Sequence, residues 1–209
     1  MMKKNKKSDS SEKLLNSAMK HFLKKGYKGS SVAEITKSAG LTRGALYCHF
    51  ETKEHLVQQI IKLFEDRYLN RVIAYVEQEN GSPLEKFQRM MHFNIQFAGE
   101  NSDLCVFMTV ISAEICGSRS RLESYIKSIY KRWNEFLAGI LKEGKRKGEF
   151  KKEIDPEMMA RVIIGVHDGV LLQREMNRET IDLLSYTKQF RSLIISGIKL
   201  DEESEVVKQ

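Results

Sequence analysis

The residues best suited to chemistry lie between Ser31 and Phe50, where two short helical segments flank a glycine. The second segment begins Thr42-Arg43-Gly44-Ala45, so a single arginine stands among small side chains. Small side chains let a helix lie deep in the DNA major groove, and arginine can donate two hydrogen bonds to O6 and N7 of guanine. The pattern predicts direct contact with double-stranded DNA. A purely structural helical corner is the alternative interpretation of the spacing alone.

Two short helices must position that arginine. Ser31 and Glu34 form a capping-box pattern at the start of the first helix. Gly40 suits a left-handed turn between the helices, and Thr42 can cap the second. The apolar residues that can pack the two helices together are Val32, Ile35 and Leu46. The segment therefore predicts a helix-turn-helix.

The charge of the chain is divided unevenly. The whole chain has a formal net charge of +7, but residues 1–50 hold eleven Lys or Arg and only three Asp or Glu. The other 159 residues are nearly balanced, with 24 basic and 25 acidic side chains. Such asymmetry predicts a basic module that binds a polyanion, joined to a neutral module with another task. For the lysines from Lys3 to Lys7, a merely solvated terminal tail is the alternative.

Several classes of protein are excluded by composition. Three cysteines in 209 residues argue against a disulfide framework and for a reducing, cytoplasmic compartment. The most apolar run, 104–116, is too short to cross a membrane and contains Glu114. The basic N-terminus is not followed by an apolar stretch, so no signal peptide is expected. We therefore expect no membrane partner.

Catalytic and metal-binding constellations are also missing from the sequence. Cys48, His49 and His55 do not have the spacing of a standard zinc site. There is no glycine-rich phosphate loop and no nucleophile elbow. The sequence predicts that the protein is not an enzyme and has neither a metal nor a cofactor.

The apolar spacing is helical throughout and predicts an all-α fold of about nine helices. Three short helices precede residue 50, and a longer helix over 51–78 follows them. Asn80-Gly81 is interpreted as a helix end rather than a hairpin, and 144–154 as a loop. The remaining helices are expected at about 83–99, 103–116, 119–143, 155–177 and 180–200, followed by an acidic tail at 201–209.

At this point a family likeness is visible. Its motifs are Gly26-Tyr27, Ser30-Ser31-Val32, Ala39-Gly40, Leu41 to Tyr47, His49-Phe50 and Lys53-Glu54-His55-Leu56. With them, residues 12–56 resemble the N-terminal region of the TetR family of bacterial transcriptional regulators. Cys48 departs from the family's usual aromatic or histidine, and Thr36 from a common alanine. The resemblance implies a helix-turn-helix domain over 1–50 and a ligand-binding and dimerisation domain over 51–200.

The resemblance also implies which residues bind operator DNA. Base contacts are implied for Arg43, Gly44 and Ala45, and contacts with phosphates or sugars for Thr42, Tyr47, His49 and Lys53. Ser30 or Ser31 would anchor the preceding helix to the DNA backbone through its N-terminus. Tyr47 could equally be a packing residue, and Phe50 is expected in the core.

The second half of the chain is rich in methionine and aromatic residues, which form adaptable apolar pockets. Ordinary core packing is the alternative for many of them. The resemblance implies a cavity for an unidentified small apolar or amphipathic effector, with His167 as a polar contact or, alternatively, as a satisfied interface residue. The candidate lining residues are Phe64, Tyr68, Met91, Phe97, Phe107, Met108, Trp133, Ile163 and His167.

The last two predicted helices are the dimer surface that the resemblance implies. Gly165 and Gly169 are four residues apart and would allow close helix approach. The candidate interface residues are Val162, Gly165, Val166, Gly169, Phe190, Leu193 and Ile194, which would form a four-helix bundle between two chains. The predicted function is a homodimeric repressor that a small effector releases from DNA. The alternative is a basic helical protein that binds acidic protein or membrane surfaces.

Overall fold

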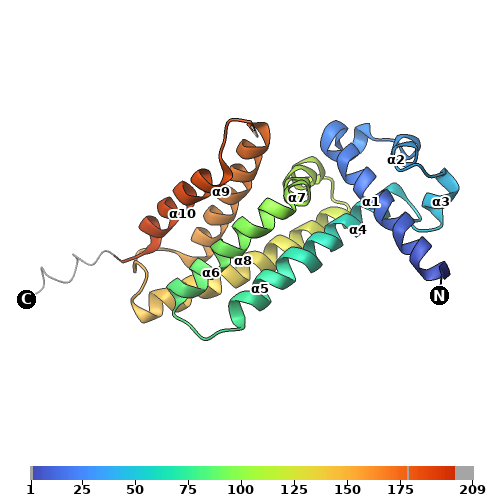
Figure 1. Ribbon diagram of the computed structural model, residues 1–209. Helices are drawn as coiled ribbons and strands as arrows, with labels where there is room; N and C mark the ends of the chain where they lie inside the picture. Colours follow the sequence, from blue (N-terminus) through green and yellow to red (C-terminus); the bar gives the residue numbers. More distant parts are fainter. Residues whose placement is uncertain (1, 178, 201–209) are drawn as a thin grey trace, which may run out of the picture. The chain divides into compact units, whose positions relative to one another are not determined.

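The computed structural model describes residues 2–177 and 179–200, and within these it leaves the side chains of residues 2–8 and 183 undescribed. The predicted acidic tail, 201–209, lies outside the described residues, as do the side chains from Lys3 to Lys7. The helices are α1 (Met2–Gly29), α2 (Val32–Ser38), α3 (Arg43–Tyr47), α4 (Lys53–Phe64), the π-helix η1 (Glu65–Leu69), α5 (Asn70–Glu77), α6 (Pro83–Glu100), α7 (Ser102–Ile115), α8 (Arg121–Lys147), α9 (Pro156–Met176) and α10 (Leu183–Ile198) (Figure 1).

The predicted all-α fold is confirmed. Within the described residues no β-strand is present, and the one isolated bridge pairs Phe150 with Lys199. Because α4, η1 and α5 follow one another without a gap, the described chain has nine separate helical segments. The predicted helix over 51–78 is therefore correct in extent, but its single π-helical turn was not predicted. Such turns are rare and have no compositional signature.

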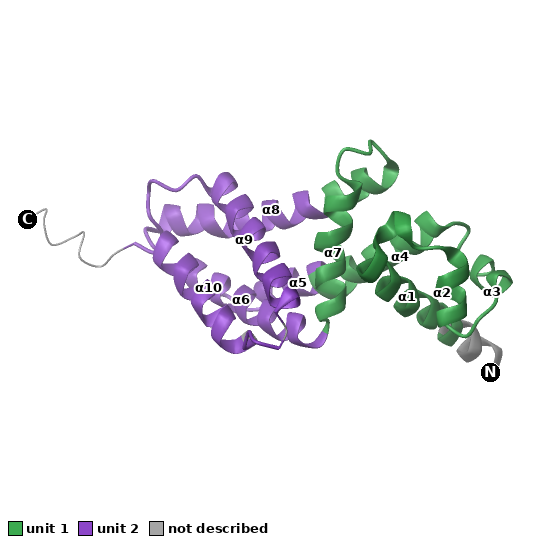
Figure 2. Cartoon of the chain, turned by 90° about the horizontal axis from the view of Figure 1, so that it is seen from above, with its two compact units in different colours: residues 1–68, 101–128 green, residues 69–100, 129–209 purple. Residues whose placement is uncertain are grey.

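The chain forms two compact units (Figure 2). The first unit comprises residues 1–68 and 101–128, which include α1 to α4 and α7. The second comprises residues 69–100 and 129–209, which include α5, α6, α9, α10 and most of α8. The functional division predicted near residue 50 is a different division of the chain and stays a prediction.

Local capping explains where many helices begin. Ser31 Oγ accepts a hydrogen bond from the Glu34 amide, and the Glu34 carboxylate accepts one from the Ser31 amide, which confirms the predicted capping box. The Thr42 side chain accepts a bond from the Ala45 amide at the start of α3. Gly40, between α2 and α3, has φ 67°. The helix-turn-helix therefore follows from short-range chemistry.

The end of α8 differs from the prediction. The sequence suggested a loop from Gly144, but the helix continues to Lys147 and Gly148, with φ 74°, follows its end. Gly144 is needed inside the helix because the fully buried ring of Phe150 lies against it. A Cβ at this position would lie 2.0 Å from Cδ2 of that ring. Gly144 therefore allows the Phe150 ring to pack directly against the backbone of α8, and it does not end the helix.

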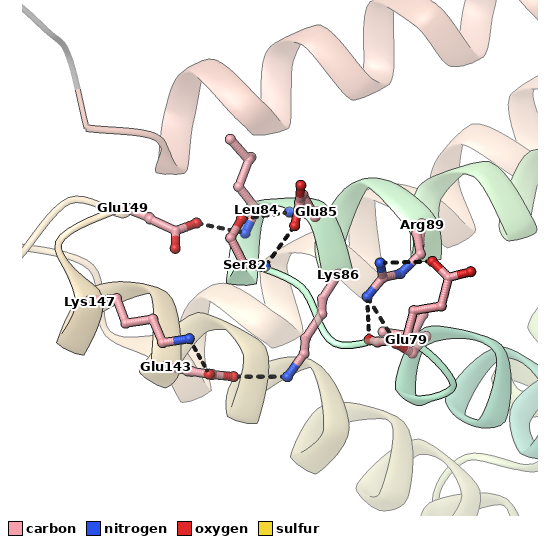
Figure 3. A network of polar contacts seen from close by, with 10 residues as sticks. Glu79, Ser82, Leu84, Glu85, Lys86, Arg89, Glu143, Lys147 and Glu149 are labelled. Carbon is pink, nitrogen blue, oxygen red and sulfur yellow. Dashed lines mark hydrogen bonds and ion pairs between the residues drawn. The ribbon is translucent and has the colours of Figure 1, made fainter.

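Polar contacts join the start of α6 to the end of α8 in the second unit (Figure 3). Glu143 forms ion pairs with Lys86 (3.1 Å) and Lys147 (2.9 Å). Both lysines lower the pKa of the Glu143 carboxyl. Glu149 accepts a hydrogen bond from the Leu84 amide at 3.0 Å. These contacts tie the two helix ends together and satisfy one of the free amides of α6.

Candidate nucleic-acid interface and effector cavity

Helix α3 presents its polar and small side chains to solvent. Arg43 and Gly44 are exposed, and Ala45 is half-buried. Leu46 is fully buried and fixes the opposite side of the helix against the first unit. Thr42 is exposed as well, although its hydroxyl oxygen also caps the helix. The residues with implied base contacts therefore lie together on the accessible side of one short helix.

The two aromatic residues after α3 have different environments. Tyr47 is 56% exposed, whereas Phe50 is 3% exposed and belongs to the core. The prediction for Phe50 is confirmed, and the packing alternative for Tyr47 is wrong. His49 is half-buried, and its ring lies 6.0 Å from that of Phe50, centroid to centroid. Tyr47 therefore extends the accessible side of α3.

Ser30 and Ser31 have distinct roles. Ser31 is exposed at the start of α2. Ser30 is 2% exposed, and its hydroxyl donates a hydrogen bond to the carbonyl oxygen of Gly26 at 2.7 Å. The assignment of Ser30 to DNA is therefore corrected: its hydroxyl stabilises the turn before α2. Ser31 alone of the two is accessible to a DNA backbone.

Lys53 is engaged with the protein itself. Its ammonium donates hydrogen bonds to the carbonyl oxygens of Tyr27 (2.8 Å) and Ser30 (3.0 Å). It also lies 4.4 Å from the centroid of the Tyr27 ring. An ammonium has three N–H donors, so these two bonds use two of them. This structural role was not visible in the sequence.

One ion pair strengthens the start of α2. Lys25 and Glu34 lie 2.5 Å apart. This contact, together with the hydrogen bonds from Ser31, lowers the pKa of the Glu34 carboxyl to about 2. The carboxylate is thus ionised at neutral pH, and the capping box carries a full negative charge near the helix N-terminus, where that charge is favourable.

The second unit contains two small adjoining recesses, both lined mostly by apolar side chains. They share four lining residues, Met91, Asn94, His167 and Phe190. Trp133 and Ile163, both predicted, line the smaller recess. Arg174 and Thr187, which were not predicted from the sequence, line the larger one. The structure thus brings together four of the predicted ligand residues from α6, α8 and α9.

The other predicted ligand residues line neither recess. Phe97 is buried in the second unit, and the remaining four lie in the core of the first. There the ring of Phe64 contacts that of Tyr68 (4.8 Å between centroids), and Phe107 contacts Phe22 (6.2 Å). The four first-unit residues are Phe64, Tyr68, Phe107 and Met108. These residues pack α4, η1 and α7 within that unit, as the core alternative expected.

Polar side chains from α6, α9 and α10 add hydrogen-bonding groups to the mostly apolar lining of the recesses. Asn94 is 6% exposed, although it stands in a stripe of methionine and phenylalanine residues. His167 Nδ1 is buried without a hydrogen-bond partner among the described residues. It lies 3.6 Å from Asp168 Oδ1, while the other oxygen of Asp168 accepts a bond from the Tyr130 hydroxyl. A buried amide within an apolar helical stripe was the signal that could have identified Asn94.

The predicted dimer surface is only partly exposed. On α10, Leu193 is 64% exposed. On α9, Val162 is 48% exposed, and Gly165 and Gly169 lie on the same outer face of the helix as Val162. Val166 is half-buried. The interface assignment of Phe190 and Ile194 is corrected, because both are buried within the chain on the inner face of α10. The outer face of α9 also includes the exposed Met158 and Met176, which were not among the predicted interface residues.

Neither a metal site nor a membrane span is found in the part of the chain that the structure describes. No group of three or more His, Cys, Asp or Glu side chains could hold a metal ion among those residues. None of the described helices is both long enough and apolar enough to cross a bilayer.

Comparisons with known families and proteins agree with this geometry. Residues 14–60 match the model of the bacterial regulatory proteins of the tetR family. Residues 64–197 match the C-terminal region of the YsiA-like proteins. Together the two matches cover both the helix-turn-helix and the helices that line the recesses.

Individual relatives span most of the chain. The fatty acid metabolism regulator protein of Bacillus subtilis is 27% identical over 88% of this chain and 93% of its own. The repressor DhaR of a Mycobacterium species is 25% identical over 88% and 91% of the two chains. Both names describe regulators, and the second is that of a helix-turn-helix transcriptional repressor.

Solved structures show the same fold. The regulator MbdR from Azoarcus has a TM-score of 0.83 at 22% identity, over 91% of this chain and all of that one. FadR from Bacillus subtilis, solved with stearoyl-CoA, has a TM-score of 0.73 at 25% identity, over 89% and 98% of the chains. This chain therefore belongs to the TetR family and is a DNA-binding transcriptional regulator, not an enzyme.

Proposed function

We propose that this protein is a homodimeric, cytoplasmic repressor that reads an operator through α3 and leaves it when an amphipathic molecule occupies the recesses of the second unit. The observation that carries the proposal is the exposed face of α3, where Arg43 stands beside Gly44 and Tyr47. A helix of this kind reads only half a site, so specificity requires two copies at a fixed spacing.

The outer face of α9 supports dimer formation. Exposed apolar and small residues recur there at helical spacing, from Met158 through Val162 and Gly165 to Gly169 and Met176. Exposed large apolar side chains on a helix favour burial against a partner. A second copy of the chain can bury this face against its own in a symmetric, self-complementary interface.

The lining of the recesses supports an amphipathic effector. Most of the lining is apolar, but Asn94, His167, Arg174 and Thr187 offer polar contacts. Among the described residues no carboxylate side chain lines either recess, and Arg174 brings a cationic side chain to the lining of the larger one. A molecule with an apolar chain and an anionic or acceptor-rich head is complementary to such a site. The FadR relative was solved with stearoyl-CoA, which has both features.

The test begins with an operator selected from random duplexes by the wild-type protein. Its affinity is then measured by fluorescence anisotropy with increasing stearoyl-CoA, and with free coenzyme A as a control that lacks the chain. We expect stearoyl-CoA to weaken operator binding and to raise the melting temperature, while free coenzyme A does neither. Equal affinity of the wild-type protein for selected and scrambled duplexes would contradict operator reading. Unchanged operator affinity at saturating stearoyl-CoA would contradict this effector class.

A further inference from the structure

One carboxylate holds the chain segment that leads into α2. Glu114, in the last turn of α7, accepts a hydrogen bond from the backbone N–H of Tyr27 at 2.7 Å and another from Lys28 at 2.9 Å. Each bond goes to a different carboxylate oxygen. Hydrogen bonds from backbone amides to a carboxylate are charge-assisted and stronger than neutral ones. Both helices that they join belong to the first unit.

The segment that Glu114 holds is a break in helix α1. Gly26 has φ 74° and ψ 166°, so helical geometry is interrupted there. Backbone amides that follow such a break need acceptors outside the regular helical pattern. A Cβ at Gly26 would lie 3.2 Å from a carboxylate oxygen of Glu114, so the carboxylate is packed closely against the break.

The carbonyl groups of the same segment are held from another helix. Lys53, at the start of α4, donates to the carbonyl oxygens of Tyr27 and Ser30. Thus α7 supplies the acceptor for two amides of segment 26–30, and α4 supplies the donor for two of its carbonyl groups. Ser31, the cap of α2, is the next residue in the chain.

The position of α2 in turn sets that of α3. The two helices pack against each other, and the Leu41 amide donates to the Thr36 carbonyl oxygen at 2.9 Å in the turn between them. We propose that Glu114 is a positioning residue for DNA recognition: its carboxylate fixes segment 26–30 and thereby orients the helix-turn-helix for the operator. The inference rests on the proposed reading of an operator through α3.

The substitution Glu114→Gln separates this role from a simple charge effect. Loss of a negative charge from a DNA-binding domain, by itself, strengthens binding to phosphates. Glutamine keeps the shape of the side chain but has one acceptor oxygen and an NH₂ donor, so it cannot accept both backbone bonds through two oxygens. A positioning role therefore predicts that Glu114→Gln weakens operator binding, whereas the loss of charge alone would strengthen it.

The experiment compares the full-length wild-type and Glu114→Gln proteins on the operator selected by the wild-type protein. We expect the dissociation constant to rise at least about tenfold on this duplex, and less than about twofold on a scrambled duplex of equal length. The control is Glu51→Gln, which removes an exposed carboxylate from the same unit and should leave operator binding unchanged or tighter. Operator binding by the Glu114→Gln variant as tight as wild type would overturn the proposal. If the wild-type protein itself binds the selected and the scrambled duplex equally well, operator reading is refuted instead.

A second measurement distinguishes positioning from general destabilisation. Hydrogen exchange read by mass spectrometry should accelerate in Glu114→Gln for peptides that contain Tyr27 and Lys28, while peptides from the middle of α4 keep their wild-type rates. The melting temperature is recorded alongside. Faster exchange spread evenly over the whole first unit would show a fold-wide effect and would overturn the positioning role.

Discussion

Lys53 and Tyr27 are joined twice: the Lys53 ammonium donates a hydrogen bond to the Tyr27 carbonyl oxygen at 2.8 Å, and it lies 4.4 Å from the centroid of the Tyr27 ring. Burial of the phenol, with the nearby carboxylates of Glu54 and Glu114, raises the pKa of Tyr27. The ring is therefore neutral at physiological pH and presents its electron-rich face to the cation. The lysine thus stabilises the first unit before any DNA is bound.

This relationship predicts two separate effects of Lys53→Met. Stability to urea should fall by about 1–3 kcal/mol, because two carbonyl oxygens lose a charged donor. The slope of log affinity against log salt should also fall by about one per site, because the expected phosphate contact of Lys53 is lost. The control is Lys62→Met, which removes an exposed α4 lysine whose ion pair with Asp66 contributes little. An unchanged salt slope would restrict Lys53 to its structural role.

Arg43→Ala should affect specificity more than general affinity. We expect a loss of about 1–3 kcal/mol on the selected operator, with relaxed preference at one position of each half-site. The matched control is Lys37→Ala, which removes an exposed cation from α2 and should weaken all duplexes alike. Binding to a panel of single-base operator variants measures both effects. Equal losses on operator and scrambled DNA for Arg43→Ala would show that Arg43 contacts only the backbone.

The features that the sequence predicted well are short-range ones. The capping box of Ser31 and Glu34 and the left-handed turn at Gly40 each depend on residues within four positions, so composition and spacing reveal them. The contacts of Glu114 with Tyr27 and Lys28 join residues more than 80 positions apart. No local pattern marks such a pair, and the partner groups are backbone amides, which every sequence has.

Periodicity also cannot decide which residues of a broad apolar helix surface are covered. On α10, Phe190 and Leu193 are both large and apolar, yet one is 6% exposed and the other 64%. Residues three positions apart lie on neighbouring parts of one helix surface, and only the packing of α10 against α6 and α9 decides which of the two is covered. For the same reason, the aromatic residues of α4 and α7 could not be separated from true cavity residues in advance.

The acid stability of the first unit should depend on Glu34. Its pKa of about 2 in the folded protein lies below the ordinary value, so the ionised carboxylate stabilises the fold. That contribution is complete above the unfolded value of about 4.3 and is lost as the pH falls toward the folded pKa. Glu34→Gln keeps an acceptor for the Ser31 amide but removes the charge. Urea unfolding should show wild type more stable than the variant at pH 7, with the difference shrinking steadily below pH 4. A difference independent of pH would mean that charge is not the cause.

Dimer formation should depend on the exposed outer residues of α9 and α10. Val162→Glu combined with Leu193→Glu should give monomers, because carboxylates would be buried against apolar surface in the interface. The control combines Arg161→Glu with Ser192→Glu, which places the same residue type at exposed neighbouring positions. Sedimentation velocity measures the assembly, and circular dichroism confirms that the helices remain. A folded Val162, Leu193 double variant that stays dimeric would place the interface on another surface.

Occupying the recesses with a protein side chain should uncouple effector from operator. Met91 is 2% exposed and lines both recesses, so Met91→Trp places an indole in the space proposed for the effector. A ligand that weakens operator binding 100-fold requires a coupling free energy of about 2.7 kcal/mol between the two binding sites. Such coupling exists only if the ligand binds the DNA-free conformation more tightly than the DNA-bound one. We expect stearoyl-CoA to lose most of its effect on the variant's melting temperature and operator affinity, while operator affinity without ligand stays within about threefold of wild type. The control is His92→Trp, which places the same indole at an exposed neighbouring position of α6 that lines neither recess and should leave the response intact. If Met91→Trp weakens operator binding without ligand as much as it weakens the response, the substitution acts on the fold and the recesses are not the effector site.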